Sequence, residues 1–307
     1  MKPRIGLTFG DPAGIGPEVI TSALRSSLIP QEVEYTVIGA DGAESFLPGK
    51  PNRDSALHAL AALEQAAELC RSGDLDGVVT GPISKKAMHE IGFDFPGQTE
   101  FFASWAGVEN YAMCLTGGKI TVALVTAHVP LREVRSLLTE EEIVRVGVLL
   151  TNFQRLRGMK CPRIAVAGYN PHAGEGGDLG REEIEIIAPA IEVLKNRFGA
   201  LGEFSGPHSP DTVFCRSVEG EFDGVLCMYH DQGLIPLKLH AFDQGVNVTL
   251  GLPFVRTSPD HGTAYEIAGK GIARPDSTIQ AITLAVDLVS GSQRLKSTEG
   301  TEFSCLS

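Results

Sequence analysis

The chain lacks the residue patterns of several protein classes. Its cysteines show no CxxC pair and no other spacing typical of a zinc site. No apolar run is long enough to cross a bilayer, and no signal peptide precedes the first strand-like segment, RIGLTFG. The sequence therefore predicts a reduced, cytoplasmic protein with buried thiols. The six cysteines are Cys70, Cys114, Cys161, Cys215, Cys227 and Cys305.

Positive charge is also scarce. The chain has 26 Lys and Arg against 38 Asp and Glu, a net charge of -12 at pH 7. This balance argues against nucleic acid or a membrane surface as a partner. An anionic small substrate is still allowed, because a pocket can be basic while the whole chain is acidic. The Walker A and GxGxxG nucleotide motifs are absent as well.

The order of apolar segments indicates the fold class. The 307 residues, 43% of them hydrophobic, suffice for one large domain or two. Strand-like and helix-like stretches alternate, which predicts an α/β protein. Helices are expected from about residue 17, over 56–70, behind a Thr139–Glu142 capping box, over 181–198 and over 277–289. The helix over 181–198 should bury Ile184, Ile187, Ile191 and Leu194.

Three histidines share one sequence context. His128 (TAHVPLRE), His172 (NPHAGEGG) and His230 (MYHDQG) each follow an apolar, strand-like stretch. Ligands of open α/β sheets bind where strands end. Three neutral imidazoles with an open position are the ligand set of a catalytic divalent metal. The pattern predicts one shared metal site, in which the neighbouring Asp231 would orient a ligand or act as a base.

Other segments suit an anion. GDPAGIGPE and TGPISKK each lie between a strand and a helix, where backbone N–H groups can hold phosphate. For the first segment the alternative is an ordinary tight turn. For the second, the alternative is that its lysines are only solvated. Gln98 and Thr99 stand at an expected helix start, where Thr99 could instead be a simple cap. Lys238, Asn247 and Arg256 can hold a phosphate or carboxylate, with a salt-bridged surface as the alternative. The glycine-rich stretch 260–281 is typical of a loop around a ligand.

Taken together, these motifs are similar to those of one family. GDPAGIGPE, TGPISK, NPHAGEGG, MYHDQG and GVNVTLGLPFVRTSPDHGTA resemble the 4-hydroxythreonine-4-phosphate dehydrogenases of vitamin B6 biosynthesis, up to about Ile282. HGTAYEIAGKGIARP also resembles the cofactor loop of isocitrate and isopropylmalate dehydrogenases, whose fold that family shares. The resemblance implies two domains with mixed sheets flanked by helices and the active site in the interdomain cleft. Residues 1–125 plus 258–307 would form an NAD-associated domain, and 126–257 a metal-binding and dimerisation domain.

The resemblance also implies a homodimer, with NAD as cofactor and a metal held by histidines from both subunits. The metal residues are His128, His172 and His230; zinc is preferred, with cobalt or magnesium as alternatives. A small phosphorylated hydroxy acid would meet Gln98, Thr99, Lys238, Asn247 and Arg256. NAD would meet Gly10, Asp11, Gly14, His261, Gly262 and Thr263. The catalytic residues would be Asp211, Asp231 and Lys238.

One residue departs from the family pattern. The family usually has His where this chain has Gln98, and Gln can donate to an oxyanion but cannot carry a proton or a positive charge. The implied reaction is NAD-dependent oxidation of 4-phosphohydroxy-L-threonine to a β-keto acid, which decarboxylates to 3-amino-2-oxopropyl phosphate for pyridoxine 5'-phosphate biosynthesis. Gln98 leaves 4-phosphothreonate or 4-phosphoerythronate open as substrates. A non-catalytic phosphometabolite-binding protein is the alternative of another class, although a binder has no need for three metal histidines.

Overall fold

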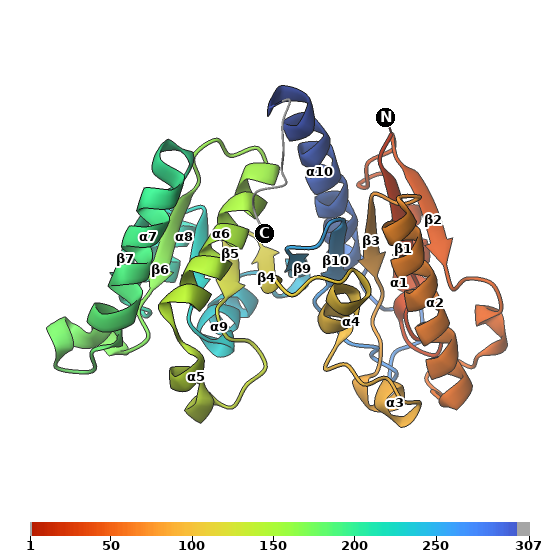
Figure 1. The fold of residues 1–307 in the computed structure, drawn as a ribbon. Helices are drawn as coiled ribbons and strands as arrows, with labels where there is room; N and C mark the ends of the chain where they lie inside the picture. Colours follow the sequence, from red (N-terminus) through yellow and green to blue (C-terminus); the bar gives the residue numbers. More distant parts are fainter. Residues whose placement is uncertain (1, 300–307) are drawn as a thin grey trace. The chain divides into compact units, whose positions relative to one another are not determined.

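The computed structural model describes residues 2–299, with side chains through residue 295 (Figure 1). These residues form two compact units: unit 1 comprises 2–109 and 246–290, and unit 2 comprises 110–245 and the chain from 291. The sequence predicted domain changes at 125/126 and 257/258 instead. The roles predicted for the two domains stay predictions. Strands and helices alternate along the chain, so the predicted α/β class is confirmed.

Unit 1 is built on a mixed sheet of five strands. Their order is β2 (Glu34–Ile38), β1 (Arg4–Thr8), β3 (Gly77–Thr80), β10 (Val255–Pro259) and β9 (Val246–Leu250). All neighbouring pairs are parallel except β10 and β9. The helices are α1 (Gly16–Leu24), α2 (Arg53–Ser72), α3 (Lys85–Glu90), α4 (Gln98–Trp105) and most of α10 (Asp276–Glu299), with a 3-10 turn η1 (Ala43–Ser45).

The two faces of the unit 1 sheet carry different helices. Apolar residues of α2, α3 and α4 share one core with Ile38 and Val78. Thr257 points the other way, since its hydroxyl donates to the carbonyl of Ala281 in α10 at 2.9 Å. Because side chains alternate along a strand, the preceding residue, Arg256, faces the side of α4. The sheet therefore sets Arg256 beside the start of α4.

Unit 2 holds the other five strands. Their order is β4 (Ala112–Gly117), β5 (Ile120–Leu124), β8 (Gly224–Cys227), β6 (Arg163–Ala167) and β7 (Glu203–His208). The β4–β5 pair is antiparallel and the others are parallel. The helices are α5 (Leu131–Leu137), α6 (Glu140–Leu156), α7 (Ala188–Phe198), α8 (Val213–Val218) and α9 (His230–Ala241). Short turns are η2 (Pro171–Gly177), η3 (Glu183–Ile187), η4 (Gly199–Leu201) and η5 (Phe242–Gln244).

Three helix predictions need correction. Ile184 is 45% exposed, whereas Ile187, Ile191 and Leu194 are buried as predicted. The reason is that residues Glu183–Ile187 form a π-helix, whose wider turn shifts the helical phase before α7 begins. The last helix runs to Glu299, well past the predicted end at residue 289. The third, α9, was not predicted, because Gly233 and Pro236 interrupt its helical pattern.

Other sequence signals are confirmed. The Thr139 hydroxyl accepts a hydrogen bond from the N–H of Glu142 at 3.2 Å, and α6 follows. The five cysteines within the described residues are free thiols, three of them buried, and Cys215 is exposed, so the prediction of buried thiols holds in part. Cys305 lies outside the described residues. None of the described helices is long and apolar enough to span a membrane.

Gly16, at the start of α1, gives a stability prediction. A methyl group at this position would lie 1.8 Å from the carbonyl oxygen of Phe9, which is backbone and cannot rotate away. We expect Gly16→Ala to lower the free energy of unfolding by about 3 kcal/mol. The control is Gly262→Ala, because a methyl group at Gly262 meets no atom within 4 Å. Urea unfolding followed by circular dichroism measures both, and equal midpoints would contradict the close approach at Gly16.

Candidate active site

The three histidine segments follow three neighbouring strands of unit 2. His128 follows β5, His230 follows β8 at the first residue of α9, and His172 follows β6 within η2. The strand order β5-β8-β6 places β8 between the other two. The predicted position of each histidine behind a strand is confirmed. Because these strands are parallel, all three segments leave the sheet at the same edge.

The imidazole rings of His128 and His230 lie next to each other. Their ring centroids are 5.5 Å apart, with the planes tilted by 45°. Two imidazoles bound to one tetrahedral zinc ion would place their centroids about 5 Å apart. Nδ1 of His230 lies 2.7 Å from Oδ1 of Asp231, which leaves Nε2 to face a ligand. The pair therefore fits two ligands of one ion, and the contact supports an orienting role for Asp231.

His172 lies in an unusual backbone turn. Residues His172 to Gly176 all have positive φ, and three of them are not glycine. Left-handed backbone costs about 1 kcal/mol or more for such residues, so the surroundings must hold the turn. The buried Glu183 carboxylate does so, accepting the N–H groups of Tyr169 and Asn170 at 2.8 and 2.7 Å. Glu183 was not a predicted site residue.

The described part of a single chain does not complete the predicted metal centre. Over residues 2–295, no group of three His, Cys, Asp or Glu side chains lies close enough to hold one ion. The chain supplies the His128–His230 pair, and His172 does not join it as a third ligand. The predicted metal role of the three histidines therefore stays a prediction.

Two predicted catalytic residues of unit 2 are also placed. Asp211 is exposed, and its carboxylate accepts a hydrogen bond from the Ser209 hydroxyl at 2.5 Å. That bond, with a contribution from nearby His172, lowers the pKa of Asp211. The carboxylate thus stays ionised near neutral pH, and the lowered pKa makes it a weaker base than an ordinary Asp. Lys238 lies on α9, with its ammonium 6.0 Å from the ring centroid of Phe242.

Arg256 is the central residue of a buried polar cluster in unit 1. It is 3% exposed, and burial lowers the pKa of its guanidinium to about 10. Its hydrogen-bond acceptors are all neutral, and Nε has no partner among the described residues. A buried cation without a carboxylate partner is set to receive an anionic ligand. The acceptors are Thr80 at 2.7 Å, Thr249 and Gln98 Oε1 at 3.2 Å, and Thr99 at 3.4 Å.

These contacts decide two alternatives left open by the sequence. The helix cap before α4 is Gly97, with no side-chain capping bond, so simple capping by Thr99 is wrong. The Arg256 contacts are not those of a salt-bridged surface. Asn247 pairs with Ser258 across β9 and β10, on the same face as Arg256, and its Oδ1 is buried without a partner among the described residues. The sequence missed Thr80 and Thr249, although Thr80 lies in the conspicuous TGPISK segment.

Three backbone N–H groups of the glycine-rich loop at residues 10–16 are already bonded to carbonyl groups of the chain. The N–H groups of Asp11, Gly14 and Ile15 donate to the carbonyls of Pro82, Asp11 and Thr263, at 2.9, 3.0 and 2.9 Å. The buried Asp11 carboxylate accepts the N–H of Ala13 at 2.9 Å and the hydroxyl of Tyr265 at 2.6 Å. This geometry favours the tight-turn reading over an anion cradle. The NAD contacts predicted for Gly10, Asp11 and Gly14 stay predictions.

The same bonds tie this loop to the segment around residue 263. Burial, together with the Asp11 contact, raises the pKa of Tyr265 to about 12, so its hydroxyl stays a donor. Nearby, Gly262 is exposed beside open space, and Nε2 of His261 is buried without a partner among the described residues. A small residue and an unpaired ring nitrogen are compatible with a ligand at His261–Thr263.

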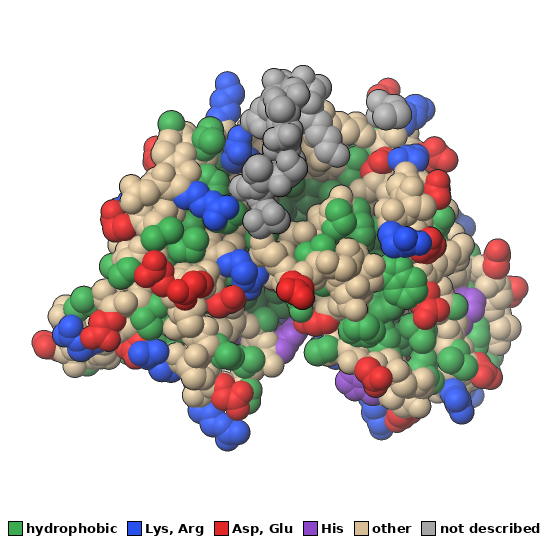
Figure 2. Space-filling view, in the orientation of Figure 1, with side chains coloured by type: hydrophobic (Ala, Val, Ile, Leu, Met, Phe, Trp, Pro, Cys, Tyr) green, Lys and Arg blue, Asp and Glu red, His purple; other side chains and the backbone are tan. Residues whose placement is uncertain are grey.

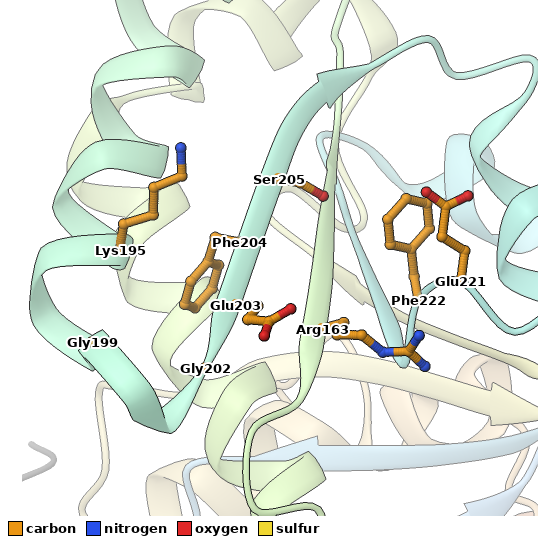
Figure 3. A pocket seen from close by; sticks show the side chains of 9 residues that line it. All are labelled: Arg163, Lys195, Gly199, Gly202, Glu203, Phe204, Ser205, Glu221 and Phe222. Atoms are coloured by element: carbon orange, nitrogen blue, oxygen red, sulfur yellow. The ribbon is translucent and has the colours of Figure 1, made fainter.

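A separate hollow lies at the edge of unit 2, beside β7 (Figure 3). Its volume is about 560 Å³, and none of the predicted site residues lines it. Arg163 pairs with Asp223 and Lys195 with Glu192, and Ser205 bonds to His208. Glu203 and Glu221 add negative charge to the lining. The mixed charges give this hollow no clear ligand preference.

The surface view agrees with the charge balance. Figure 2 shows Lys and Arg side chains scattered among Asp and Glu side chains over the face in view.

Comparison with known families decides the assignment of the chain. The family model described as "Pyridoxal phosphate biosynthetic protein PdxA" matches residues 19–285. The chain belongs to the PdxA family. The matched range includes the three histidines, Arg256 and the glycine-rich stretch from residue 260 on, and it lies in both units.

Three proteins named as dehydrogenases are similar to this chain over nearly their full length. A Caulobacter vibrioides protein named 4-hydroxythreonine-4-phosphate dehydrogenase is 44% identical over 329 residues, covering 92% of this chain and 97% of the relative. A solved structure of the Klebsiella pneumoniae protein of that name is 36% identical, with a TM-score of 0.79 over 94% of this chain and 100% of that one. A terephthalate 1,2-cis-dihydrodioldehydrogenase from Burkholderia xenovorans is 26% identical, with a TM-score of 0.69 over 94% and 98%.

More distant structures share the fold alone. Isocitrate dehydrogenase from Methylococcus capsulatus is 14% identical, with a TM-score of 0.50 over 96% of this chain and 89% of that one. The predicted isocitrate dehydrogenase-like fold is thereby confirmed.

Proposed function

We propose that this chain is an NAD-dependent, divalent-metal-dependent 4-hydroxythreonine-4-phosphate dehydrogenase that serves pyridoxine 5'-phosphate biosynthesis. The match of 92% of the chain to a relative of that name carries the proposal. The substrate is oxidised at its secondary alcohol, and the β-keto acid formed loses CO2 to give 3-amino-2-oxopropyl phosphate. The proposed reaction needs a residue that binds the substrate phosphate, a role for Arg256, and a cation beside the reacting hydroxyl, which the histidines would hold.

The residues of the chain have separate tasks in this proposal. Arg256 binds the phosphate, oriented by its bonds to Thr80, Thr249 and Gln98. Thr99, Asn247 and Lys238 add hydrogen bonds to the substrate. Phosphate binding far from the reacting carbon orients the rest of the molecule.

The histidines and acids act at the other end of the substrate. His128, His172 and His230 would hold the cation. Zinc is preferred, because imidazole ligands suit zinc better than they suit magnesium. A bound cation supplies Lewis acidity, which eases removal of a hydroxyl proton near neutral pH. His261, Gly262 and Thr263 would hold NAD, which would supply the hydride acceptor when bound. Asp211 or Asp231 would accept the proton; Oδ1 of the first already bonds to Ser209 and Oδ1 of the second to His230, which leaves Oδ2 of either carboxylate as the acceptor.

A homodimer with a shared metal site completes the proposal. On α9, which begins at His230, and at the residue that follows its end, three large apolar side chains are exposed at helical spacing: Ile235, Leu239 and Phe242, at 64, 88 and 71%. Such a stripe is typical of a face that packs against another chain. A second copy would cover it and bring the partner subunit's His172 to the His128–His230 pair. The cytoplasmic location stays a prediction.

A substrate panel with and without chelator tests the function. NADH formation is followed at 340 nm with 4-phosphohydroxy-L-threonine, 4-phosphothreonate and 4-phosphoerythronate. We expect the highest kcat/KM for the first substrate, loss of turnover after chelation, and recovery on addition of zinc or cobalt. Turnover that persists fully in chelator would refute the metal requirement. Absence of NADH with all three substrates would favour a phosphometabolite-binding protein.

Gln98 is the residue that keeps the related substrates under consideration. Its Nε2 donates to the Gly81 carbonyl at 3.0 Å while its Oε1 accepts from Arg256, so the amide is fixed in one orientation. We expect Gln98→His, which restores the usual family residue, to raise kcat/KM for 4-phosphohydroxy-L-threonine relative to 4-phosphothreonate by roughly tenfold, the effect of one hydrogen bond to a charged group. An unchanged ratio would show that position 98 does not set substrate choice.

A further inference from the structure

Hydrogen bonds join the three histidine segments at the ends of their strands. Thr126, two residues before His128, donates both its N–H and its hydroxyl to the carbonyl of Met228, at 3.2 and 2.7 Å. Met228 lies two residues before His230. Its own N–H donates to Oε1 of Gln232 at 2.7 Å. The segments of His128 and His230 are therefore fixed to each other at Met228.

Gln232 extends this network to the third segment. Its Nε2 donates to the carbonyl of Gly168 at 2.7 Å. Gly168 directly follows β6 and begins the segment that leads to His172, and its N–H donates to the carbonyl of His208 at 2.8 Å. One side-chain amide thus bonds to two histidine segments, through its oxygen to Met228 and through its nitrogen to Gly168.

The position of Gln232 at the start of α9 restricts the movement of its side chain and so of its two hydrogen bonds. It is the third residue of the helix, and the residue before the helix, Tyr229, is extended and provides no side-chain cap. The Gln232 oxygen reaches back past Tyr229 to Met228, much as the third residue of a capping box reaches back to the chain entering a helix. The side chain is buried, with 7% exposed, so water cannot replace either bond. The path of the chain through His230 is fixed as a result.

We propose that Gln232 is a positioning residue for the metal-binding histidines. It contacts neither substrate nor cofactor in this proposal, and acts by fixing the first residues of the His230 segment and of the His172 segment, which serve the two shared sites of the proposed dimer. The inference rests on the proposed function, because it assumes that these histidines bind a cation. Only an amide meets both demands, since one end must accept an N–H and the other must donate to a carbonyl.

Two substitutions test the two hydrogen bonds of the Gln232 side chain. Gln232→Met keeps the length and volume of the side chain and removes both bonds. Gln232→Glu keeps an acceptor for the N–H of Met228 and places an oxygen against the Gly168 carbonyl. Gln154→Met is the matched control. Gln154 is also fully buried, its Nε2 donates to the carbonyl of Asp223, and Asp223 precedes β8 at its opposite end.

The test measures cobalt binding to the full-length protein. Cobalt(II) is titrated in competition with a chelator, and its visible absorption reports the ligand geometry. We expect Gln232→Met to weaken cobalt affinity about 10- to 100-fold, the usual effect of losing a residue that supports a metal ligand, and to change the spectrum. We expect Gln154→Met to lower the thermal unfolding midpoint comparably while keeping the wild-type affinity and spectrum.

The outcomes are distinct. Wild-type cobalt affinity and spectrum in Gln232→Met would overturn the proposal, as would equal losses of affinity in Gln232→Met and Gln154→Met. If Gln232→Met does not fold, Gln232→Glu decides: a loss of at least about tenfold supports the proposal and wild-type affinity overturns it. A His230→Asn protein that binds cobalt as tightly as the wild type would refute the histidine metal site itself, and the role of Gln232 with it.

Discussion

Mixing two inactive variants, His172→Asn and His230→Asn, is expected to restore about a quarter of wild-type activity. In a shared site, each metal centre takes His128 and His230 from one subunit and the partner subunit's His172. Random reassociation makes half of the dimers mixed, and each mixed dimer has one intact site and one doubly altered site, which gives about one quarter. NADH formation after joint unfolding and refolding, or after co-expression, measures the recovery.

The choice of asparagine follows from the backbone at His172. Its φ is 51°, and asparagine tolerates this left-handed region better than alanine does. His172 is also exposed, so its replacement should leave the fold intact. Each variant alone should show no turnover. The control mixes His128→Asn with His230→Asn. One subunit supplies both of these histidines to each site, so every site in a mixed dimer still lacks one of them and no activity should return. Recovery in the control, or none in the test mixture, would contradict a site shared in this way.

Replacement of Arg256 is expected to have the second large effect. Arg256→Met removes the buried guanidinium that binds the phosphate, and loss of its charge-assisted bonds, about 3 kcal/mol, should raise KM about 100-fold. The effect on kcat should be smaller. Steady-state kinetics measure both constants, and an unchanged KM would remove Arg256 from phosphate binding.

A binding experiment and a pH series support the same test. Inorganic phosphate should raise the thermal unfolding midpoint of the wild type but not of Arg256→Met. Arg145→Met is the control, because Arg145 pairs with Glu142 on α6 and should not affect phosphate binding. Burial lowers the pKa of Arg256 only to about 10, so its guanidinium stays charged between pH 7 and 9. The contribution of Arg256 to KM should therefore not vary over that range.

Local patterns were enough to locate most site segments. The placement of each histidine behind a strand needed only an apolar run followed by a turn, and the Thr139 cap needed only residues three apart. The same reasoning failed for α9, because Pro236 and Gly233 suppress the local helix signal while packing of Leu234 and Leu237 on the sheet stabilises the helix. It failed at Ile184 because a π-helix changes the residue spacing that the pattern assumes.

The sequence by itself determined the α/β class, the strand-end histidines and the family, since each depends on residues that are neighbours in the chain. Only the tertiary structure decided that Arg256 is buried among neutral acceptors, because Thr80, Gln98 and Thr249 reach it from three separate segments. The same holds for Gln232, whose two backbone partners are 60 residues apart (228 against 168). Hydrogen bonds between distant segments leave no periodic trace in the sequence, and only the folded sheet brings their atoms within reach.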